Sequence, residues 1–455
     1  MINGETIAAI STAPGVGGIA VVRVSGPKAI EICDKLFHPR REGRNLSTVR
    51  AQSAVFGSFD GIDEVVATVF RKPHSFTGED VVEISCHGSL YIQQTILQRL
   101  IDAGCRLADH GEYTMRAFMN GRMDLAVAEA VADLIGARSQ KAHQLALRQM
   151  QGSVSTRLSE LREKLLELTS LLELELDFSD HEDVEFADRS RLKELTAQTQ
   201  AEIERLMNSF ATGNAIRNGV AVAIVGAPNA GKSTLLNKLA GDDCAIVSDI
   251  PGTTRDTVER TVVYRGVMFR LIDTAGIHET DDVIERMGIE RSEKAMRDAR
   301  IIVALSENGD FKEIDGLSVE THCRASNFNK EDRRVVLCRS KADISISQED
   351  ATEHILNISA RTGQNIDRLM DMLYEYASID ESEDVVITSQ RHYEALRMAL
   401  DDIRRVGEGI ELQIPSDLVA EDLRACLAHL GEITGGTITA DETLGNIFSH
   451  FCIGK

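Results

Sequence analysis

The spacing of apolar and polar positions changes along the 455-residue chain, and each change predicts a different kind of structure. Pro14 and the glycines at 15, 17 and 18 predict a turn, and 92–101 has the spacing of an amphipathic helix. Short apolar runs predict β-strands at 6–10, 19–24, 65–70 and 81–85. Residues 1–118 are therefore expected to form an α+β domain.

Helical spacing begins near residue 119, and no proline occurs between Pro73 and Pro228. A stripe of leucines with Glu and Lys between them predicts the core of packed helices over 119–217, rather than a binding site: Leu158, Leu161, Leu165, Leu168 and Leu172. The same spacing returns at 393–400 and 417–424. Residues 378–455 are therefore expected to complete the helical domain.

Between the two helical parts, apolar runs alternate with helical segments, which predicts a doubly wound α/β sheet over 218–377. Gly213 and Gly219 bracket an expected linker into this domain. The strands are expected at 220–225, 261–264, 267–272, 300–305, 335–338 and 355–358. The simplest organisation is an α/β domain inserted into a helical domain.

The first of these strands leads into the pattern G-x-x-x-x-G-K-S at 226–233, which a helical segment follows at 234–239. Strand, glycine loop and helix in this order are typical of a P-loop. The loop N–H groups would cradle phosphate, Lys232 would reach the outer phosphates, and Ser233 would offer its hydroxyl to Mg²⁺. We therefore expect a nucleoside triphosphate to be bound and hydrolysed.

Downstream motifs indicate that the nucleotide is GTP. Asp273 to Gly276 form a D-x-x-G pattern, and 359–361 resemble the last base-contact loop. The stretch 340–343 resembles the guanine motif Asn-Lys-x-Asp, with Ser340 in the first place. Asp343 can accept hydrogen bonds from guanine N1–H and its amino group, so adenine would leave the carboxylate unpaired. The short Ser340 predicts guanine specificity with lower affinity.

Ile277 follows the D-x-x-G pattern and cannot orient the attacking water as a glutamine does in many regulatory GTPases. Two substitutes are present. Asn229 could ligate a monovalent cation, and Glu285 could orient water through a second water. A solvated helical acid is the equally weighted alternative for Glu285.

Composition limits the possible functions. The length suggests about three domains, and no apolar run is long enough for a bilayer. The first residues lack the pattern of a secretory signal, and eight scattered cysteines argue against zinc and disulfides, so we expect a cytoplasmic, reduced protein. The net charge of −22 disfavours general coating of nucleic acid, so an RNA role would need a local basic patch or a basic partner.

Two further stretches give expectations. The acidic segment 173–188 is expected to be a solvated loop between helices rather than a metal site. The apolar, aromatic tail 444–455 is expected to dock, which would place Cys452 and Lys455 in a pocket or interface. For Cys452, an inert buried thiol remains the alternative.

The chain resembles the bacterial tRNA modification GTPase MnmE (TrmE) family over essentially its whole length. The resemblance rests on the inserted GTPase domain, the tail Phe-Cys-Ile-Gly-Lys, and the motifs at 13–19, 23–26, 75–80, 83, 87–88, 111–118 and 120–126. It implies a multidomain fold with an α+β N-terminal folate-binding and dimerisation domain, an α-helical domain and an inserted α/β Ras-like P-loop G domain.

The resemblance also implies an activity. Such a protein is a potassium-activated GTPase that acts with the flavoprotein MnmG, as a heterotetramer built on its own homodimer. Together they place an aminomethyl or carboxymethylaminomethyl group on the wobble uridine of certain tRNAs. A reduced folate supplies the one-carbon unit, and FAD is held only by the partner. Arg23, Glu83 and Arg122 would line the folate pocket with Lys455 reaching in; structural salt bridges are the alternative.

For the GTPase site, the resemblance implies Glu285 as the catalytic carboxylate and Mg²⁺ held by Ser233 and Thr254. Potassium would be held by Asn229, Ser248, Ile250 and Thr253. The implied nucleotide contacts are Asn229, Ala230, Gly231, Lys232, Ser233, Thr234, Ser248, Asp249, Ile250, Pro251, Gly252, Thr253, Thr254, Asp273, Thr274, Ala275, Gly276, Ser340, Lys341, Asp343, Ser359, Ala360 and Arg361.

Ser340 and Pro251 depart from the family pattern, at the guanine motif and in the potassium loop respectively. The alternative function is a GTPase switch for ribosome or membrane assembly, since similar potassium-dependent G domains occur there. The N-terminal domain and the tail favour tRNA modification, because an assembly switch needs no folate pocket.

Overall fold

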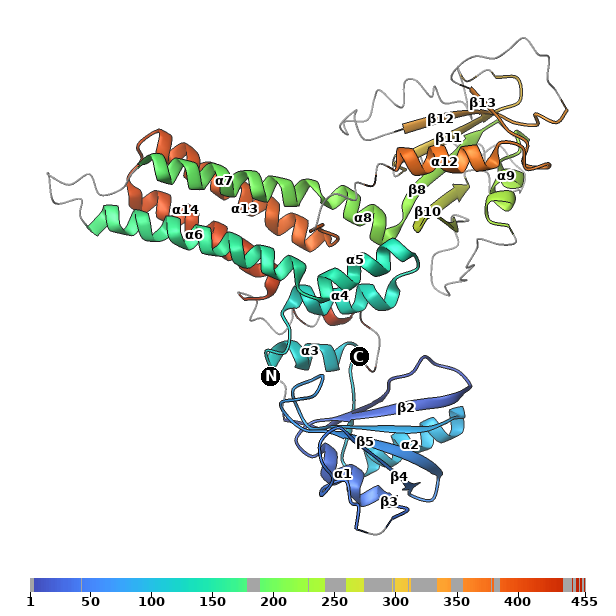
Figure 1. Ribbon diagram of the computed structural model, residues 1–455, viewed down its shortest axis with the longest axis vertical. Coiled ribbons are helices and arrows are strands. Elements are labelled where there is room, and N and C mark those ends of the chain that lie inside the picture. Colours follow the sequence, from blue (N-terminus) through green and yellow to red (C-terminus); the bar gives the residue numbers. More distant parts are fainter. Residues whose placement is uncertain are drawn as a thin grey trace, which may run out of the picture. The chain divides into compact units, whose positions relative to one another are not determined.

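The structure is a computed structural model (Figure 1). It describes residues 4–41, 43–177, 189–227, 229–241, 259–273, 297, 299–309, 311, 334–344, 355–377, 379, 385–436, 444, 447–449, 451 and 454. The chain divides into two compact units, which are described separately. Unit 1 joins Met1–Ile135, Gln149–Thr199 and Met398–Lys455, and unit 2 joins Gly136–Arg148 and Gln200–Arg397. The expected classes of structure, α+β, α-helical and α/β, are all present.

The N-terminal part of unit 1 is a seven-stranded sheet in the order β3-β4-β5-β6-β2-β1-β7, antiparallel except between β1 and β7. Helices α1 (Ala29–Leu36) and α2 (Leu90–Asp102) pack into one apolar core with this sheet. The strands are β1 (Ile7–Ile10), β2 (Gly17–Ser25), β3 (Phe37–Pro39), β4 (Ser53–Phe59), β5 (Asp63–Phe70), β6 (Val81–Gly88) and β7 (Arg106–Leu107). The predicted strands and helix are confirmed, whereas α1, β3, β4 and β7 were not predicted.

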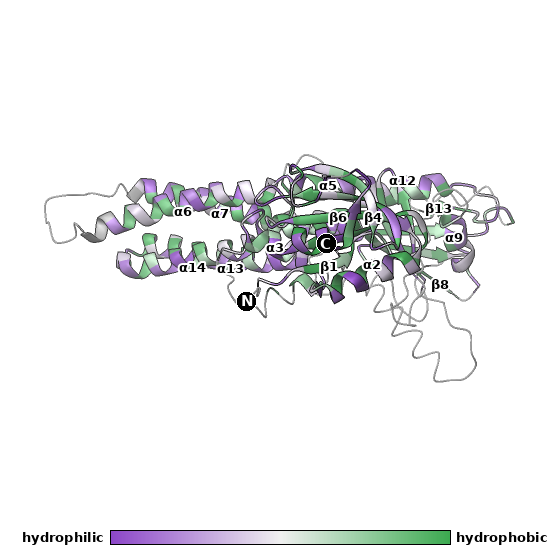
Figure 2. Cartoon of the chain, turned by 90° about the horizontal axis from the view of Figure 1, so that it is seen from below, coloured by the Kyte–Doolittle hydropathy of each residue, from purple (hydrophilic) through white to green (hydrophobic). Residues whose placement is uncertain are grey.

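Helices make up the rest of unit 1 and continue into unit 2. They are α3 (Glu112–Met119), α4 (Leu125–Gly136), α5 (Gln140–Met150), α6 (Ser153–Asp177), α7 (Arg189–Asn208), α13 (Gln390–Glu411) and α14 (Ser416–Thr434). Hydrophilic and hydrophobic residues alternate along α6 and α14, as Figure 2 shows, and these two helices pack together. The leucine stripe of α6 is at most 3% exposed, which confirms that it is core.

The expected loop at 173–188 is wrong at its start. Helix α6 continues to Asp177, because Leu172 is 2% exposed and keeps this end of the helix in the core. The rest of that acidic segment, with Asp180, Glu182, Asp183 and Glu185, lies outside the described residues.

Unit 2 contains a six-stranded sheet in the order β13-β12-β11-β8-β10-β9, parallel except between β9 and β10. Its strands are β8 (Val220–Gly226), β9 (Glu259–Tyr264), β10 (Val267–Asp273), β11 (Ile301–Ser306), β12 (Arg334–Arg339) and β13 (Ile355–Asn357). Every residue of β8 is buried, because alternate side chains enter cores on opposite faces of the sheet. All six strands therefore lie where the sequence predicted them.

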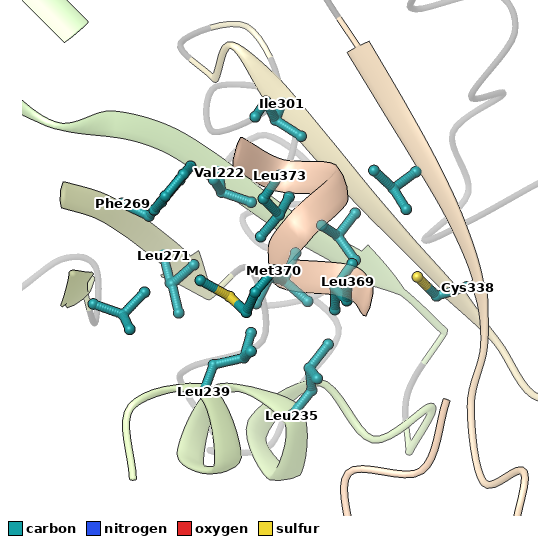
Figure 3. Packing of buried hydrophobic residues seen from close by; sticks show 14 of the residues in the cluster. Val222, Leu235, Leu239, Phe269, Leu271, Ile301, Cys338, Leu369, Met370 and Leu373 are labelled. Carbon is teal, nitrogen blue, oxygen red and sulfur yellow. The ribbon is translucent and has the colours of Figure 1, made fainter. Parts of the chain in front are cut away.

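Two helices cover one face of this sheet, α9 (Lys232–Leu239) and α12 (Ile366–Tyr376). Figure 3 shows the side chains that meet there, from α9 Leu235 and Leu239, from α12 Leu369, Met370 and Leu373, and from the strands Val222, Phe269 and Leu271. This packing fixes the start of α9 against the ends of the strands, where the candidate site lies.

The expected linker between Gly213 and Gly219 is wrong, because helix α8 (Phe210–Asn218) runs through it. Gly213 lies against the backbone of Ile387, and a Cβ at this position would be 2.1 Å from the Ile387 carbonyl oxygen. Glycine is therefore needed here for close packing. Gly219, with φ 83°, ends the helix and turns the chain into β8.

Candidate functional site

The loop from Gly226 to Lys232 joins β8 to α9 and turns through two left-handed residues, Asn229 (φ 66°) and Gly231 (φ 94°). Gly226 passes so close to β11 that a Cβ would lie 2.5 Å from the Leu305 carbonyl oxygen. The buried Lys232 ammonium donates hydrogen bonds to the carbonyl oxygens of Gly226 and of Ala227, the latter at 3.1 Å. A tight loop with a lysine at a helix N-terminus has the chemistry to bind phosphate.

Ser233 and Asp273 meet beside this loop. Strand β10 pairs in parallel with β8, with Asp273 opposite Ile224. The Ser233 hydroxyl lies 3.4 Å from Asp273 Oδ2. A hydroxyl and a carboxylate oxygen at this separation suit Mg²⁺, which takes oxygen ligands and keeps several of its waters. The residues present therefore fit a magnesium ion.

A cavity of about 200 Å³ lies at the carboxyl ends of the parallel strands. The P-loop helix, the end of β12 and the segment after β13 all contribute to its lining, which consists of Gly231, Thr234, Leu235, Leu305, Ser340, Lys341, Asp343, Ile344, Ile358, Ser359, Ala360 and Arg361. The structure thus brings together the two predicted base-contact segments, because β12 and β13 are parallel neighbours.

Asp343 is held in one orientation by a buried neighbour. The Ser359 hydroxyl, which is fully buried, donates to Asp343 Oδ1 at 2.7 Å and accepts from the Thr362 N–H at 3.2 Å. This hydrogen bond is the main reason that the pKa of Asp343 is lowered from its usual value. Asp343 itself is exposed at the mouth of the cavity. The Asp343 carboxylate would therefore be buried only when a bound base covers it.

The side chains of Ser340 and Lys341 differ in whether they have a polar partner. Ser340 is 6% exposed, and its hydroxyl has no hydrogen-bond partner among the described residues. Lys341 (φ 57°) forms an ion pair with Glu307, which follows β11. Glu307 was not predicted, because no motif marks it and only the pairing of β11 with β12 places it beside Lys341.

A second cluster lies on the N-terminal sheet. Arg23 of β2 is in register with Glu83 of β6, and its Nε and Nη2 contact Glu83 Oε1 at 2.9 and 2.8 Å. The Arg23 guanidinium also lies over the rings of Phe76 and Tyr113, at 5.8 and 5.6 Å from their centroids. Arg122 is exposed and runs beside Gly78, where a Cβ would be 3.3 Å from Arg122 Cγ. The structure thus brings Arg23 and Glu83 into contact, with Arg122 beside a neighbouring loop.

The chain tail docks on the same domain, as expected. The Gly454 carbonyl oxygen accepts from the Ser11 hydroxyl at 3.0 Å and from Arg23 Nη1 at 3.4 Å. Phe448 and Phe451 are buried, 5.0 Å apart between ring centroids, in a core with Leu125 of α4. Gly454 therefore reaches the Arg23 and Glu83 pair.

Several predicted residues lie outside the described part of the chain. They are Ser248, Asp249, Ile250, Pro251, Gly252, Thr253, Thr254, Thr274, Ala275, Gly276, Glu285, Cys452 and Lys455. Within the described residues, no group of three or more His, Cys, Asp or Glu side chains is placed to hold a metal ion. No helix in the described ranges combines the length and the apolar character needed to cross a membrane.

A P-loop, a Ser and Asp pair beside it and a cavity of about 200 Å³ at the ends of parallel strands define the class of P-loop GTPases. Residues 125–452 match the family described as "MnmE helical domain", and residues 6–122 match "GTP-binding protein TrmE N-terminus". The tRNA modification GTPase MnmE of Parabacteroides distasonis is 52% identical over 99% of this chain and all of its own length. That of Christiangramia forsetii is 45% identical over 99% of both chains.

The chain therefore belongs to the MnmE family, and it is a GTP hydrolase that uses a guanine nucleotide and Mg²⁺. Among solved structures, Era of Aquifex aeolicus bound to GDP and AlF4⁻ is 26% identical over 40% of this chain and 65% of its own, with a TM-score of 0.26. The G domain of the FeoB iron transporter of T. maritima is 24% identical over 35% of this chain and 99% of its own, with a TM-score of 0.25.

Proposed function

We propose that this chain is a potassium-activated GTPase that modifies the wobble uridine of certain tRNAs together with the flavoprotein MnmG. The group added is aminomethyl or carboxymethylaminomethyl, and a reduced folate gives its one-carbon unit. The observation that carries the proposal is the 52% identity to a tRNA modification GTPase over 99% of the chain. The Asp343 and Ser359 arrangement supports guanine as the base.

In the GTPase site, Lys232 and the loop N–H groups hold the phosphates, with Thr234 and the flanking Ala230 and Gly231 beside them. Ser233 and Thr254 hold Mg²⁺, which offsets phosphate charge when bound. Asp343 accepts from the guanine edge, with Ser340, Lys341 and the segment 359–361 around the base. The remaining contacts proposed are 248–254 and 273–276.

Glu285 orients the attacking water, which takes over the role that Ile277 cannot perform. Potassium, held by Asn229, Ser248, Ile250 and Thr253, places positive charge at the phosphates. Asn229 has a left-handed backbone conformation, which asparagine adopts more readily than most residues, so this residue type suits its place in the loop. Removing any of these groups would slow hydrolysis and leave the guanine pocket intact.

Arg23, Glu83 and Arg122 bind the reduced folate, with Lys455 reaching in from the tail. The residues fit such a ligand: a carboxylate can clamp the amide–amidine edge of a pterin, and cations suit its glutamate tail. The docked tail supports this assignment, since Gly454 contacts Arg23 directly. Cys452 would then lie near the same pocket.

The proposed domains are 1–118 for folate binding and homodimerisation, 119–217 and 378–455 for the helical domain, and 218–377 for the G domain. The partners are GTP, tRNA, a second copy and MnmG in a heterotetramer, with FAD only on MnmG. The site of action is the cytoplasm. Opening and closing of the G domains during hydrolysis moves the helices and reorganises the modification site.

The proposal is tested by GTP hydrolysis in potassium and in sodium, with a reduced folate titrated by calorimetry. Strong stimulation by potassium and saturable folate binding are expected. Potassium dependence without folate binding would favour the second candidate, a ribosome- or membrane-assembly switch. Hydrolysis that is equal in both salts would contradict the potassium assignment.

A further inference from the structure

The segment between β3 and β4 has a local charge opposite to that of the chain. From 40 to 52 it contains one acidic residue, Glu42, and four basic ones, Arg40, Arg41, Arg44 and Arg50, in a chain with a net charge of −22. An acidic protein that approaches a polyanion needs such a local reversal of charge.

Residues 43–52, here called the basic loop, are held firmly on the domain. Leu46 is fully buried in the core, and the Leu46 N–H and the Ser47 hydroxyl donate to the Asp34 carboxylate at 2.6 and 2.7 Å. Arg71 Nη2 donates to the carbonyl oxygens of Ser47 at 2.8 Å and of Val49 at 3.3 Å. The loop backbone is therefore anchored to α1 and to the end of β5.

The outward side chains of the basic loop are hydrogen-bond donors. Arg44 and Arg50 are exposed, and among the described residues neither forms an ion pair. Asn45, Thr48 and Gln52 are exposed as well, and the loop contains no acidic residue. Guanidinium, hydroxyl and amide groups of this kind contact phosphate and sugar oxygens in nucleic-acid complexes. An anchored backbone lowers the entropy cost of that contact.

We propose that the basic loop binds the sugar–phosphate backbone of the tRNA substrate. This inference rests on the proposed function and locates a surface for its substrate. The loop has no outward apolar anchor, because Leu46 is buried and Val49 is half-buried. A membrane surface or a protein interface would need such an anchor, so an RNA backbone is the better match.

The test measures the affinity of the full-length chain for labelled tRNA by fluorescence anisotropy, at KCl concentrations from about 50 to 200 mM. The variants are Arg44→Ala with Arg50→Ala, and Arg44→Lys with Arg50→Lys. The matched control removes two exposed arginines of α6 and α13, Arg162→Ala with Arg397→Ala, and so the same charge. GTP hydrolysis and circular dichroism are recorded for each variant.

The loop alanine variant should bind tRNA roughly tenfold or more weakly at about 0.1 M salt, and its salt slope should fall by about 2, one for each lost phosphate contact. The lysine variant should keep the wild-type slope, because it keeps both charges. GTP hydrolysis should not change in either loop variant, since the loop belongs to unit 1.

A wild-type slope in the loop alanine variant would overturn the inference while leaving the proposed function intact. An equal loss in the control would also overturn it, since net charge alone would then explain the effect. A wild-type chain that binds no tRNA at any of these salt concentrations would contradict the proposed function as well.

Discussion

Replacing Glu112 with alanine should make local opening of the N-terminal domain more frequent. Arg116 is 1% exposed and Glu112 is 3% exposed, and Arg116 Nη2 donates to Glu112 Oε1 at 2.8 Å. Glu112 also accepts from Arg106 and from the Asp109 N–H. Breaking a buried ion pair by removing one partner costs about 3–5 kcal/mol. Arg116 keeps Glu79 at 3.1 Å, so we expect the lower end, about 3 kcal/mol, for Glu112→Ala.

The assay is amide hydrogen exchange in the full-length chain, because it reports local opening without assuming two-state unfolding of several domains. Protection should fall in β1 and α3, and GTP hydrolysis should not change. Glu64→Ala is the matched control, since it breaks the Arg40–Glu64 pair, whose side chains are 74% and 58% exposed, at a cost of about 0–1 kcal/mol. Unchanged protection in Glu112→Ala, or an equal effect in the control, would show that the buried ion pair does not stabilise this part of the domain.

The same pair predicts a dependence on pH. Burial raises the pKa of Glu112, but hydrogen bonds from Arg106, Asp109 and Arg116 outweigh it, so the pKa is below its usual value of 4.5. A carboxyl with a lowered folded-state pKa stabilises the fold above 4.5, and this stability is lost as the pH falls through the folded value. In the wild-type chain, the hydrogen-exchange protection of β1 should therefore decrease as the pH is lowered below 4.5. In Glu112→Gln, the part of this decrease that comes from protonation of Glu112 should be absent.

Four further changes test the sites. Glu285→Ala should leave GTP binding intact and abolish hydrolysis; normal turnover would contradict the catalytic role. Asn229→Ala should remove potassium stimulation, so a variant that still distinguishes potassium from sodium would count against it. Ser359→Ala should free the Asp343 carboxylate and weaken GDP binding several-fold. The control Ser209→Ala, which removes another buried hydroxyl, should leave GDP binding unchanged. Equal GDP affinities of the two variants by calorimetry would refute this. Deleting 452–455 should abolish tRNA modification and spare GTPase activity, and loss of both would show that the tail is structural.

The strands of unit 2 could be predicted because burial on both faces leaves a continuous apolar run, as in β8. The proximity of segments 340–343 and 359–361 could be predicted too. Parallel strands place their carboxyl ends at one edge of a sheet, and the sequence indicated the strands before both segments.

Contacts between distant side chains could not be predicted. The Lys341–Glu307 pair, the Ser359–Asp343 hydrogen bond and the buried Arg116 depend on strand register and helix packing, which no local pattern encodes. For the same reason, the prediction of a linker at Gly213 was wrong. The need for glycine there comes from the backbone of Ile387, which is far away in the sequence.

The most direct test of the account is mass spectrometry of tRNA nucleosides from a bacterial strain that lacks its own MnmE and carries this chain. We expect aminomethyl or carboxymethylaminomethyl wobble uridine to return with the wild-type chain and not with Lys232→Ala, which removes the phosphate-binding ammonium. Unmodified wobble uridine in cells whose wild-type chain hydrolyses GTP would contradict it.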